Sequence, residues 1–146
     1  MIDDDLSILL VRFEFSNGPL WATPGGGVEA DESPEEAIRR ELVEEVGMRN
    51  VELGPVIWTR THVFPLSPEF DGQRETFYLV RSQRPMEQPS FSPGELQAEG
   101  LTGSRWWTSS ELRAADGHRF APSRLPVLFD ALLSKGPPAE PLDAGV

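Results

Sequence analysis

The hydrophobic pattern begins with a nearly continuous apolar run and then changes to alternation. Residues 6–15 read LSILLVRFEF and end at the sequence SNGP, residues 16–19. The continuous first half predicts a central strand, and the strong turn signal predicts that the chain reverses after it. A second apolar run at residues 20–22 predicts a short strand that leads directly into a glycine-rich turn.

Apolar residues next recur at every fourth position, at Ile38, Leu42 and Val46. This spacing places them in one stripe along a helix, and we expect the stripe to face the core. Ser33 has the chemistry of a helix N-cap, with proline next and a glutamate three residues later, which completes a capping box. Gly47 suits the left-handed residue just past a helix end, so the sequence predicts a helix between Ser33 and Gly47.

The rest of the chain alternates between strand, loop and helix patterns. In chain order we predict a strand at residues 51–62, a turn-rich loop at 66–72, a strand at 74–80, a proline-rich loop at 85–94, a strand at 101–108, a short helix at 110–112 and a final helix at 123–135. The dipeptide Gly54-Pro55 predicts a bulge or kink in the first of these strands, and Ser123 can cap the last helix. The tail, residues 136–146, is rich in Pro, Gly and Ala and is predicted to be disordered.

Composition narrows the class of protein. A chain of 146 residues is long enough for one domain with a proper core, which we assign to residues 1–135. A net charge of −11 argues against nonspecific nucleic-acid binding, because such binding needs Lys and Arg to neutralise phosphates. The chain has no cysteine, which excludes disulfides and thiol catalysis, and it has no membrane-length apolar run or signal-peptide pattern. We therefore expect a cytoplasmic protein with no membrane partner.

Three carboxylates crowd one side of the predicted helix. At 100° per residue, Glu41, Glu44 and Glu45 share an arc roughly 100° wide beside the apolar stripe. Each like-charged i,i+4 pair costs a helix about 0.2–0.5 kcal/mol, so a compensating charge is expected. Arg39 and Arg40 offset part of it, and a hard divalent cation, which prefers oxygen ligands, offsets more. The alternative is an ordinary solvated acidic face.

The spacing of the motif favours the cation. The order is Gly26, five residues, Glu32, seven residues, Arg40-Glu41, an apolar residue, any residue, Glu44-Glu45, any residue, Gly47 and a final apolar residue. Residues 26–48 thus resemble the signature of the Nudix hydrolase family, the Nudix box, at each of its fixed positions. Asp31 is a local departure, because the family often has glycine there, and we expect it only to tighten the turn.

The resemblance implies an α/β fold, an α/β/α sandwich with a mixed central sheet flanked by helices. It also implies hydrolysis of a nucleoside diphosphate linked to another moiety, with Mg²⁺ or Mn²⁺ as cofactor. By the same resemblance Glu44 and Glu45 are expected to be direct metal ligands, and Glu41 either a ligand or the residue that orients the water. The carbonyl of Gly25 is expected to complete the ligand shell.

Two further roles follow from the resemblance. Arg40 is expected to orient the carboxylates through salt bridges, and Glu32 to stabilise the junction between the glycine loop and the helix, with Gly26 and Gly47 as structural positions. Many family members carry a glutamate before the strand that here ends in Arg-Trp-Trp, and it can be a metal ligand or general base. Glu99 is the first candidate and Glu95 the second, and the alternative is that both are solvated loop residues.

Three arginines are candidates for substrate contact, namely Arg12, Arg60 and Arg74. Arginine suits bidentate phosphate recognition, although an exposed or edge position on a strand is the ordinary explanation of each of them and the one we favour. Trp21, next to the glycine turn, is interpreted as core packing rather than as a platform for base stacking.

Two functions from different classes remain. One is a metal-dependent pyrophosphohydrolase, and the other is a Nudix-fold module that binds a nucleotide or nucleotide sugar without turnover. The presence of both Glu44 and Glu45 favours the enzyme. The motif does not specify the substrate beyond the diphosphate, and the short segment before Leu6 favours a monomer or a simple homodimer.

Overall fold

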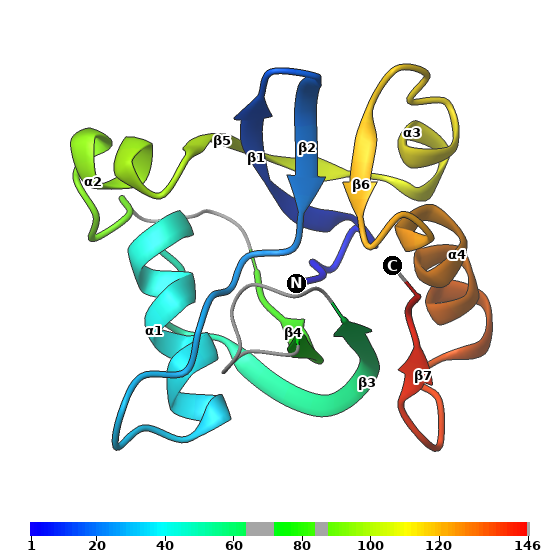
Figure 1. Cartoon of the computed structure of the whole chain (residues 1–146). Coiled ribbons are helices and arrows are strands. Elements are labelled where there is room, and N and C mark those ends of the chain that lie inside the picture. The colour runs from blue at the N-terminus through cyan, green and yellow to red at the C-terminus, as the bar shows by residue number, and fades with distance from the viewer. Residues whose placement is uncertain (64–71, 84–87, 146) are drawn as a thin grey trace.

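The strands of the protein form two mixed sheets with helices on either side. The computed structural model describes residues 1–63, 72–83 and 88–145. Within these residues, the first sheet has the order β5-β1-β2-β6 and the second the order β4-β3-β7. Helices α1 and α2 lie on one side of the strands, and α3 and α4 lie on the other (Figure 1). The predicted α/β class, with mixed sheets flanked by helices, is therefore confirmed, but the strands form two sheets rather than one.

The first sheet is built around β1 (Ile8–Phe15), the predicted central strand. It pairs antiparallel with β2 (Gly18–Ala22) and with β5 (Leu101–Trp107), and β2 pairs parallel with β6 (Arg119–Ala121). The first four residues of β1 are fully buried, which explains their continuous hydrophobicity.

The second sheet contains the two predicted antiparallel strands. They are β3 (Glu52–His62) and β4 (Gln73–Arg81), and the register shifts on either side of Val56 confirm the irregularity expected at Gly54-Pro55. A short strand, β7 (Leu142–Asp143), pairs parallel with β3. Isolated bridges from Ile2 to Ile8 and to Arg81 connect the two sheets.

Helix α1 (Pro34–Val46) has the predicted boundaries and the predicted caps. The hydroxyl of Ser33 accepts from the backbone N–H of Glu36 at 3.2 Å, and the carboxylate of Glu36 accepts from the N–H of Ser33 at 2.7 Å. Gly47 ends the helix in the left-handed conformation, with φ of 69°. The remaining helices are α2 (Pro93–Ala98), α3 (Ser109–Arg113) and α4 (Leu125–Lys135).

Strand β1 separates two hydrophobic clusters. Ile8 and Leu10 face a cluster that includes residues of α4, whereas Leu9 and Val11 face a cluster that includes residues of α1. Successive side chains of a strand point to opposite faces, so β1 joins the two layers of the core.

The tryptophans follow the same division. Trp21 and Trp107 pack edge to face, with ring centroids 5.1 Å apart, in the cluster beside α4. Trp106 packs against the other cluster. This arrangement confirms Trp21 as a core residue, and it places the adjacent Trp106 and Trp107 on opposite faces of β5.

Several expectations differ from the structure. Ser123 does not cap the last helix, which begins at Leu125 with Arg124 at the N-cap position and no side-chain cap. The predicted proline-rich loop at 85–94 lies outside the described residues at 85–87, and its end is the start of α2 rather than loop. The predicted loop at 66–72 lies outside the described residues except for Gly72.

The C-terminal tail also differs from the predicted disorder. Residues 142–143 form β7, the N–H of Ala144 donates to the carbonyl of Thr59 at 2.8 Å, and Ala144 is fully buried. In addition, the described part of the chain contains no helix with the length and hydrophobicity that a bilayer crossing requires.

Candidate active site

Three glutamates of α1, namely Glu41, Glu44 and Glu45, line one hollow of about 310 Å³. Glu41 and Glu45 are buried, each with 9% exposure, and Glu44 is half-buried. The glycine run 25–27 forms the facing wall, and Phe13, Phe91 and Leu101 supply an apolar side. Because an apolar wall excludes water, charges in this hollow interact more strongly than they would at the surface.

Arg40 connects the glycine loop to the glutamates. Its guanidinium donates to Glu32 at 2.7 Å and to the carbonyl of Gly27 at 3.0 Å. It also donates to Glu41 at 2.9 Å and to Glu44 at 3.0 Å. The hydrogen bond from Arg40 holds the pKa of Glu32 below its usual value, and Glu32 in turn raises the pKa of Arg40. The predicted roles of Arg40 and Glu32 therefore correspond to one network at the loop–helix junction.

Glu45 is the most perturbed carboxylate of the site. Burial raises its pKa to about 8, the negative charges of Glu41, Glu99 and Glu44 act in the same direction, and a hydrogen bond from the backbone N–H of Gly25 opposes them. That N–H lies 3.0 Å from Oε2 of Glu45. The structure thus records Gly25 as a donor to a carboxylate, whereas the sequence predicted its carbonyl as a metal ligand.

Glu41 lies against the backbone of the glycine loop. A Cβ atom added to Gly26 would lie 2.2 Å from Oε1 of Glu41, so only glycine allows this approach. Burial raises the pKa of Glu41, and its hydrogen bond to Arg40 opposes that shift.

Two glutamates before β5 were candidates for a metal ligand or general base. Glu99 lines the hollow, and Glu95 does not. The negative charge of Glu99 contributes to the raised pKa of both Glu41 and Glu45. Glu95 instead accepts from the N–H of Ser92 at 2.7 Å in the capping box of α2, which lowers its pKa.

The chain just before α2 docks on the C-terminal end of α1. The N–H of Ser90 donates to the carbonyl of Val43 at 3.0 Å, and the N–H of Phe91 donates to the carbonyl of Glu44 at 3.2 Å. The bond to Glu44 satisfies a carbonyl that the end of a helix leaves free, and the two bonds together hold Phe91 at the hollow. Phe91 was missed in the sequence, because its proline-rich surroundings carry no periodic signal.

The oxygen atoms that line the hollow are suitable ligands for a hard divalent cation. The groups are carboxylate oxygens held beside a glycine backbone, and such cations prefer oxygen ligands. Burial raises the pKa of both Glu41 and Glu45, and the neighbouring negative charges act in the same direction. As they stand, no three acidic, histidine or cysteine side chains of the described residues are arranged as a metal-ligand group. Arg40 and the N–H of Gly25 engage the three glutamates instead.

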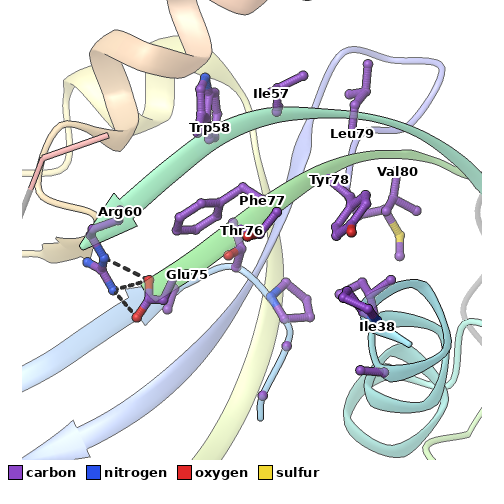
Figure 2. A pocket seen from close by; sticks show the side chains of 18 of the residues that line it. Ile38, Ile57, Trp58, Arg60, Glu75, Thr76, Phe77, Tyr78, Leu79 and Val80 are labelled. Carbon is purple, nitrogen blue, oxygen red and sulfur yellow. Dashed lines mark hydrogen bonds and ion pairs between the residues drawn. The ribbon is translucent and has the colours of Figure 1, made fainter. Parts of the chain in front are cut away.

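A second, larger cleft of about 600 Å³ borders the same glycine run. It lies between α1 and the strands β3 and β4, and its walls are mainly apolar and aromatic (Figure 2). The glycine run 25–27 lines both hollows, so a ligand that crosses it reaches the carboxylates on one side and the apolar cleft on the other.

The three candidate arginines are separated by the structure. Arg60 and Arg74 line the apolar cleft, Arg60 largely buried and Arg74 exposed. Arg12 lines neither hollow and forms an ion pair with Glu14 at 2.9 Å. Among the other cleft residues, Phe77 and Tyr78 received no functional prediction, because their alternation in the sequence indicates only a strand.

Comparisons with known proteins identify the family of the chain. A family model described as NUDIX domain matches residues 1–128. An RNA pyrophosphohydrolase from Sulfurovum sp. is 43% identical over 67 residues, which cover 42% of this chain and 43% of that protein. The nucleoside triphosphatase NudI of Escherichia coli is 34% identical over 83 residues, which cover 55% of this chain and 59% of that protein.

A likeness to solved structures supports the fold. The NUDIX hydrolase from Nitrosomonas europaea has a TM-score of 0.60 and 21% identity, over 93% of this chain and 87% of that one. Against the curated relatives, the match spans less than two thirds of their length.

Proposed function

Since the chain belongs to the NUDIX domain family, we propose that it is a divalent-metal-dependent pyrophosphohydrolase. Its substrate is a nucleoside diphosphate linked to a further group, and water attacks a phosphorus of the diphosphate. The P–O bond of the anhydride breaks, and the products are a nucleoside monophosphate and a phosphorylated second fragment. Two relatives bear names for reactions that split such anhydrides, an RNA pyrophosphohydrolase and a nucleoside triphosphatase.

One observation carries the proposal. Glu41, Glu44 and Glu45 face the glycine run in a single partly apolar hollow, and Glu99 lines it from another element. Four carboxylates in one hollow repel a phosphate substrate, so a cation is needed between them. When bound, Mg²⁺ or Mn²⁺ neutralises phosphate oxygens and activates a water molecule.

The side chains around the hollow have different proposed roles. Glu44 and Glu45 would hold the cation, with Glu41 as a further ligand or as the residue that orients the attacking water. Glu99, which comes from the turn before β5, would act as a ligand or accept the proton of the water. Arg40 keeps Glu41 and Glu44 oriented through its hydrogen bonds. Gly26 permits the close approach of Glu41 to the loop.

The proposal is tested by release of phosphate products from a panel of nucleoside diphosphate derivatives. Each compound is assayed with Mg²⁺, with Mn²⁺ and with chelator, for the wild type and for Glu45→Gln. That substitution keeps the shape of the side chain and removes its charge. We expect metal-dependent turnover that falls by roughly 100-fold or more in Glu45→Gln, as loss of a transition-state contact does.

Glu52→Gln is the matched control, because Glu52 is an exposed strand residue that lines neither hollow. It should keep wild-type turnover. Turnover that survives Glu45→Gln would place the reaction elsewhere, and binding without turnover across the whole panel would favour a nucleotide-binding module.

A further inference from the structure

The apolar cleft ends at one charged pair. Arg60 and Glu75 lie directly opposite each other on β3 and β4, and Figure 2 shows them at one end of the cleft. The Nε atom of Arg60 donates to Oε2 of Glu75 at 2.7 Å, and Nη2 donates to Oε1 at 2.7 Å. The side chain of Arg60 is only 11% exposed and that of Glu75 is 26% exposed. Burial of a charged pair carries a desolvation penalty that largely cancels its attraction, so stability alone does not explain this pair.

Aromatic side chains occupy the next rung of the same strand pair. Trp58 lies opposite Phe77, two residues from Arg60 and Glu75 respectively, so all four side chains belong to one face of the ladder. The rings of Trp58 and Phe77 are 6.2 Å apart. Figure 2 shows Phe77 beside the Arg60–Glu75 pair. A flat heterocycle placed against Phe77 would therefore bring its polar edge to that pair.

Glu75 uses only part of the donor capacity of Arg60. The guanidinium has five N–H donors in a fixed planar fork. Its bonds to Glu75 come from Nε and Nη2, so Nη1 takes no part in this pair. The bidentate contact fixes the plane of the guanidinium, which leaves the Nη1 side as an oriented donor on the wall of the cleft.

We propose that Arg60 selects the nucleobase of the substrate, and that Glu75 is the positioning residue that holds Arg60 in place. The preferred base presents two adjacent acceptors to the guanidinium, as O6 and N7 of guanine do. Adenine presents an amino donor at the position of O6, and its N–H groups would face those of Arg60. This inference rests on the proposed function, since it assigns the base end of the same substrate to the cleft.

The first test uses the wild-type protein and changes single atoms of the ligand. Calorimetry with Mg²⁺ measures the dissociation constants of GMP, IMP, AMP and 7-deaza-GMP. IMP keeps O6 and N7 and lacks only the exocyclic amino group, so it should bind like GMP. AMP and 7-deaza-GMP should bind more weakly by roughly 5- to 150-fold, the range for one bidentate base contact. Equal binding of all four nucleotides would overturn the proposal.

The second test separates orientation from charge. Arg60→Lys keeps the positive charge and loses the planar fork, and Glu75→Gln loosens the clamp on Arg60. Both should remove most of the preference of GMP over AMP. Arg81→Lys is the matched control, because Arg81 is exposed on the same strand β4 and does not line the cleft. Retention of the wild-type preference in Arg60→Lys would contradict the role of Arg60.

Turnover separates this inference from the proposed function. If the preference for guanine is right, GTP and ATP should differ mainly in KM, and Arg60→Lys should raise KM for GTP while kcat stays nearly constant. Guanine-selective binding without any hydrolysis would refute the pyrophosphohydrolase and leave the base selection intact. Hydrolysis with no base preference in the wild type or the variants would refute the base selection and leave the pyrophosphohydrolase intact.

Discussion

Gly26 controls whether Glu41 can reach the hollow. A side chain at this position would collide with the Glu41 carboxylate, since the added Cβ would lie 2.2 Å from Oε1. We predict that Gly26→Ala lowers turnover by roughly 100-fold, because a displacement of about 1 Å in a reacting group has that effect. The initial rate with the preferred substrate of the panel is the measurement.

The neighbouring glycine provides the control. A Cβ atom at Gly27 would meet nothing within 4 Å. Gly27→Ala should therefore change turnover by no more than about twofold, as substitutions at open surface positions do. Equal losses in the two variants would show that the loop needs glycine for flexibility and not for the approach of Glu41.

The raised pKa of Glu45 should make the stability of the protein depend on pH in an unusual way. Its pKa is about 8 in the folded protein and 4.5 in the reference state, so between these values the folded state binds more protons than the unfolded state. The contribution of Glu45 to the free energy of unfolding in chelator should then fall as pH rises from about 4.5 to 8. Each pKa unit corresponds to about 1.4 kcal/mol, so the fall is on the order of a few kcal/mol. Glu41, whose pKa is also raised, acts in the same direction.

Urea unfolding of the wild type and of Glu45→Gln at several pH values measures this dependence. The variant has no group to titrate at this position, so its stability advantage over the wild type should grow toward pH 8. Carboxylates with lowered pKa, such as Glu32 and Asp130, act below about pH 4.5. The buried Met1 amino group, whose pKa is lowered to about 5, titrates within the window but equally in both proteins, so it cancels in their difference. A constant difference between the two proteins from pH 5 to pH 8 would contradict the buried state of Glu45.

At the scale of elements, α1 was predictable because its signals are local. Its caps, its apolar stripe and the arc of Glu41, Glu44 and Glu45 all lie within one continuous stretch. Asp31 illustrates a finer point, since its φ of 66° is the left-handed conformation that glycine adopts easily and that Asp tolerates. The prediction that it would only tighten the turn agrees with this geometry.

Arg40 is the contact through which α1 holds the glycine loop. Removal of its side chain in Arg40→Ala breaks hydrogen bonds to Glu32 and to the carbonyl of Gly27. We predict a loss of about 1–3 kcal/mol in the free energy of unfolding, typical of hydrogen bonds to charged groups, together with reduced turnover. Chemical denaturation and steady-state kinetics measure the two effects.

Arg39 offers the matched comparison on the same helix. Its side chain is exposed and donates at 3.3 Å to the carbonyl of Val51, away from the hollow. Arg39→Ala should change stability by less than about 0.5 kcal/mol and leave turnover intact. Similar effects of the two substitutions would mean that the charge of the helix matters and the loop contact does not.

Other elements were not predicted, because they form through contacts between distant parts of the chain that no local sequence pattern indicates. Strand β6 has only three residues and exists because it pairs with β2, and β7 likewise exists through its pairing with β3. Helix α2 is six residues long and has a capping box at Ser92, a signal that its proline-rich surroundings outweighed in the prediction. Short elements of this kind are set by tertiary pairing rather than by local propensity.

At the scale of the whole molecule, two hollows meet at one glycine loop. The acidic hollow was predicted from the close spacing of Glu41, Glu44 and Glu45 together with the family resemblance, which suggested Glu99. The apolar cleft was not, because it combines α1, β3 and β4, whose side chains meet only after folding. The Arg60–Glu75 pair shows the same limit, since its partners are fifteen residues apart and share a register that the sequence does not state.

The central claim is that the acidic hollow binds a divalent cation through the glutamates of α1. Calorimetric titration with Mn²⁺ at pH 8 tests it most directly, on the wild type, Glu45→Gln and the control Glu52→Gln. We predict saturable binding to the wild type and the control, and an affinity lower by roughly tenfold or more for Glu45→Gln, as for other changes at metal sites. Binding of Mn²⁺ to Glu45→Gln with wild-type affinity would show that Glu45 does not hold the cation.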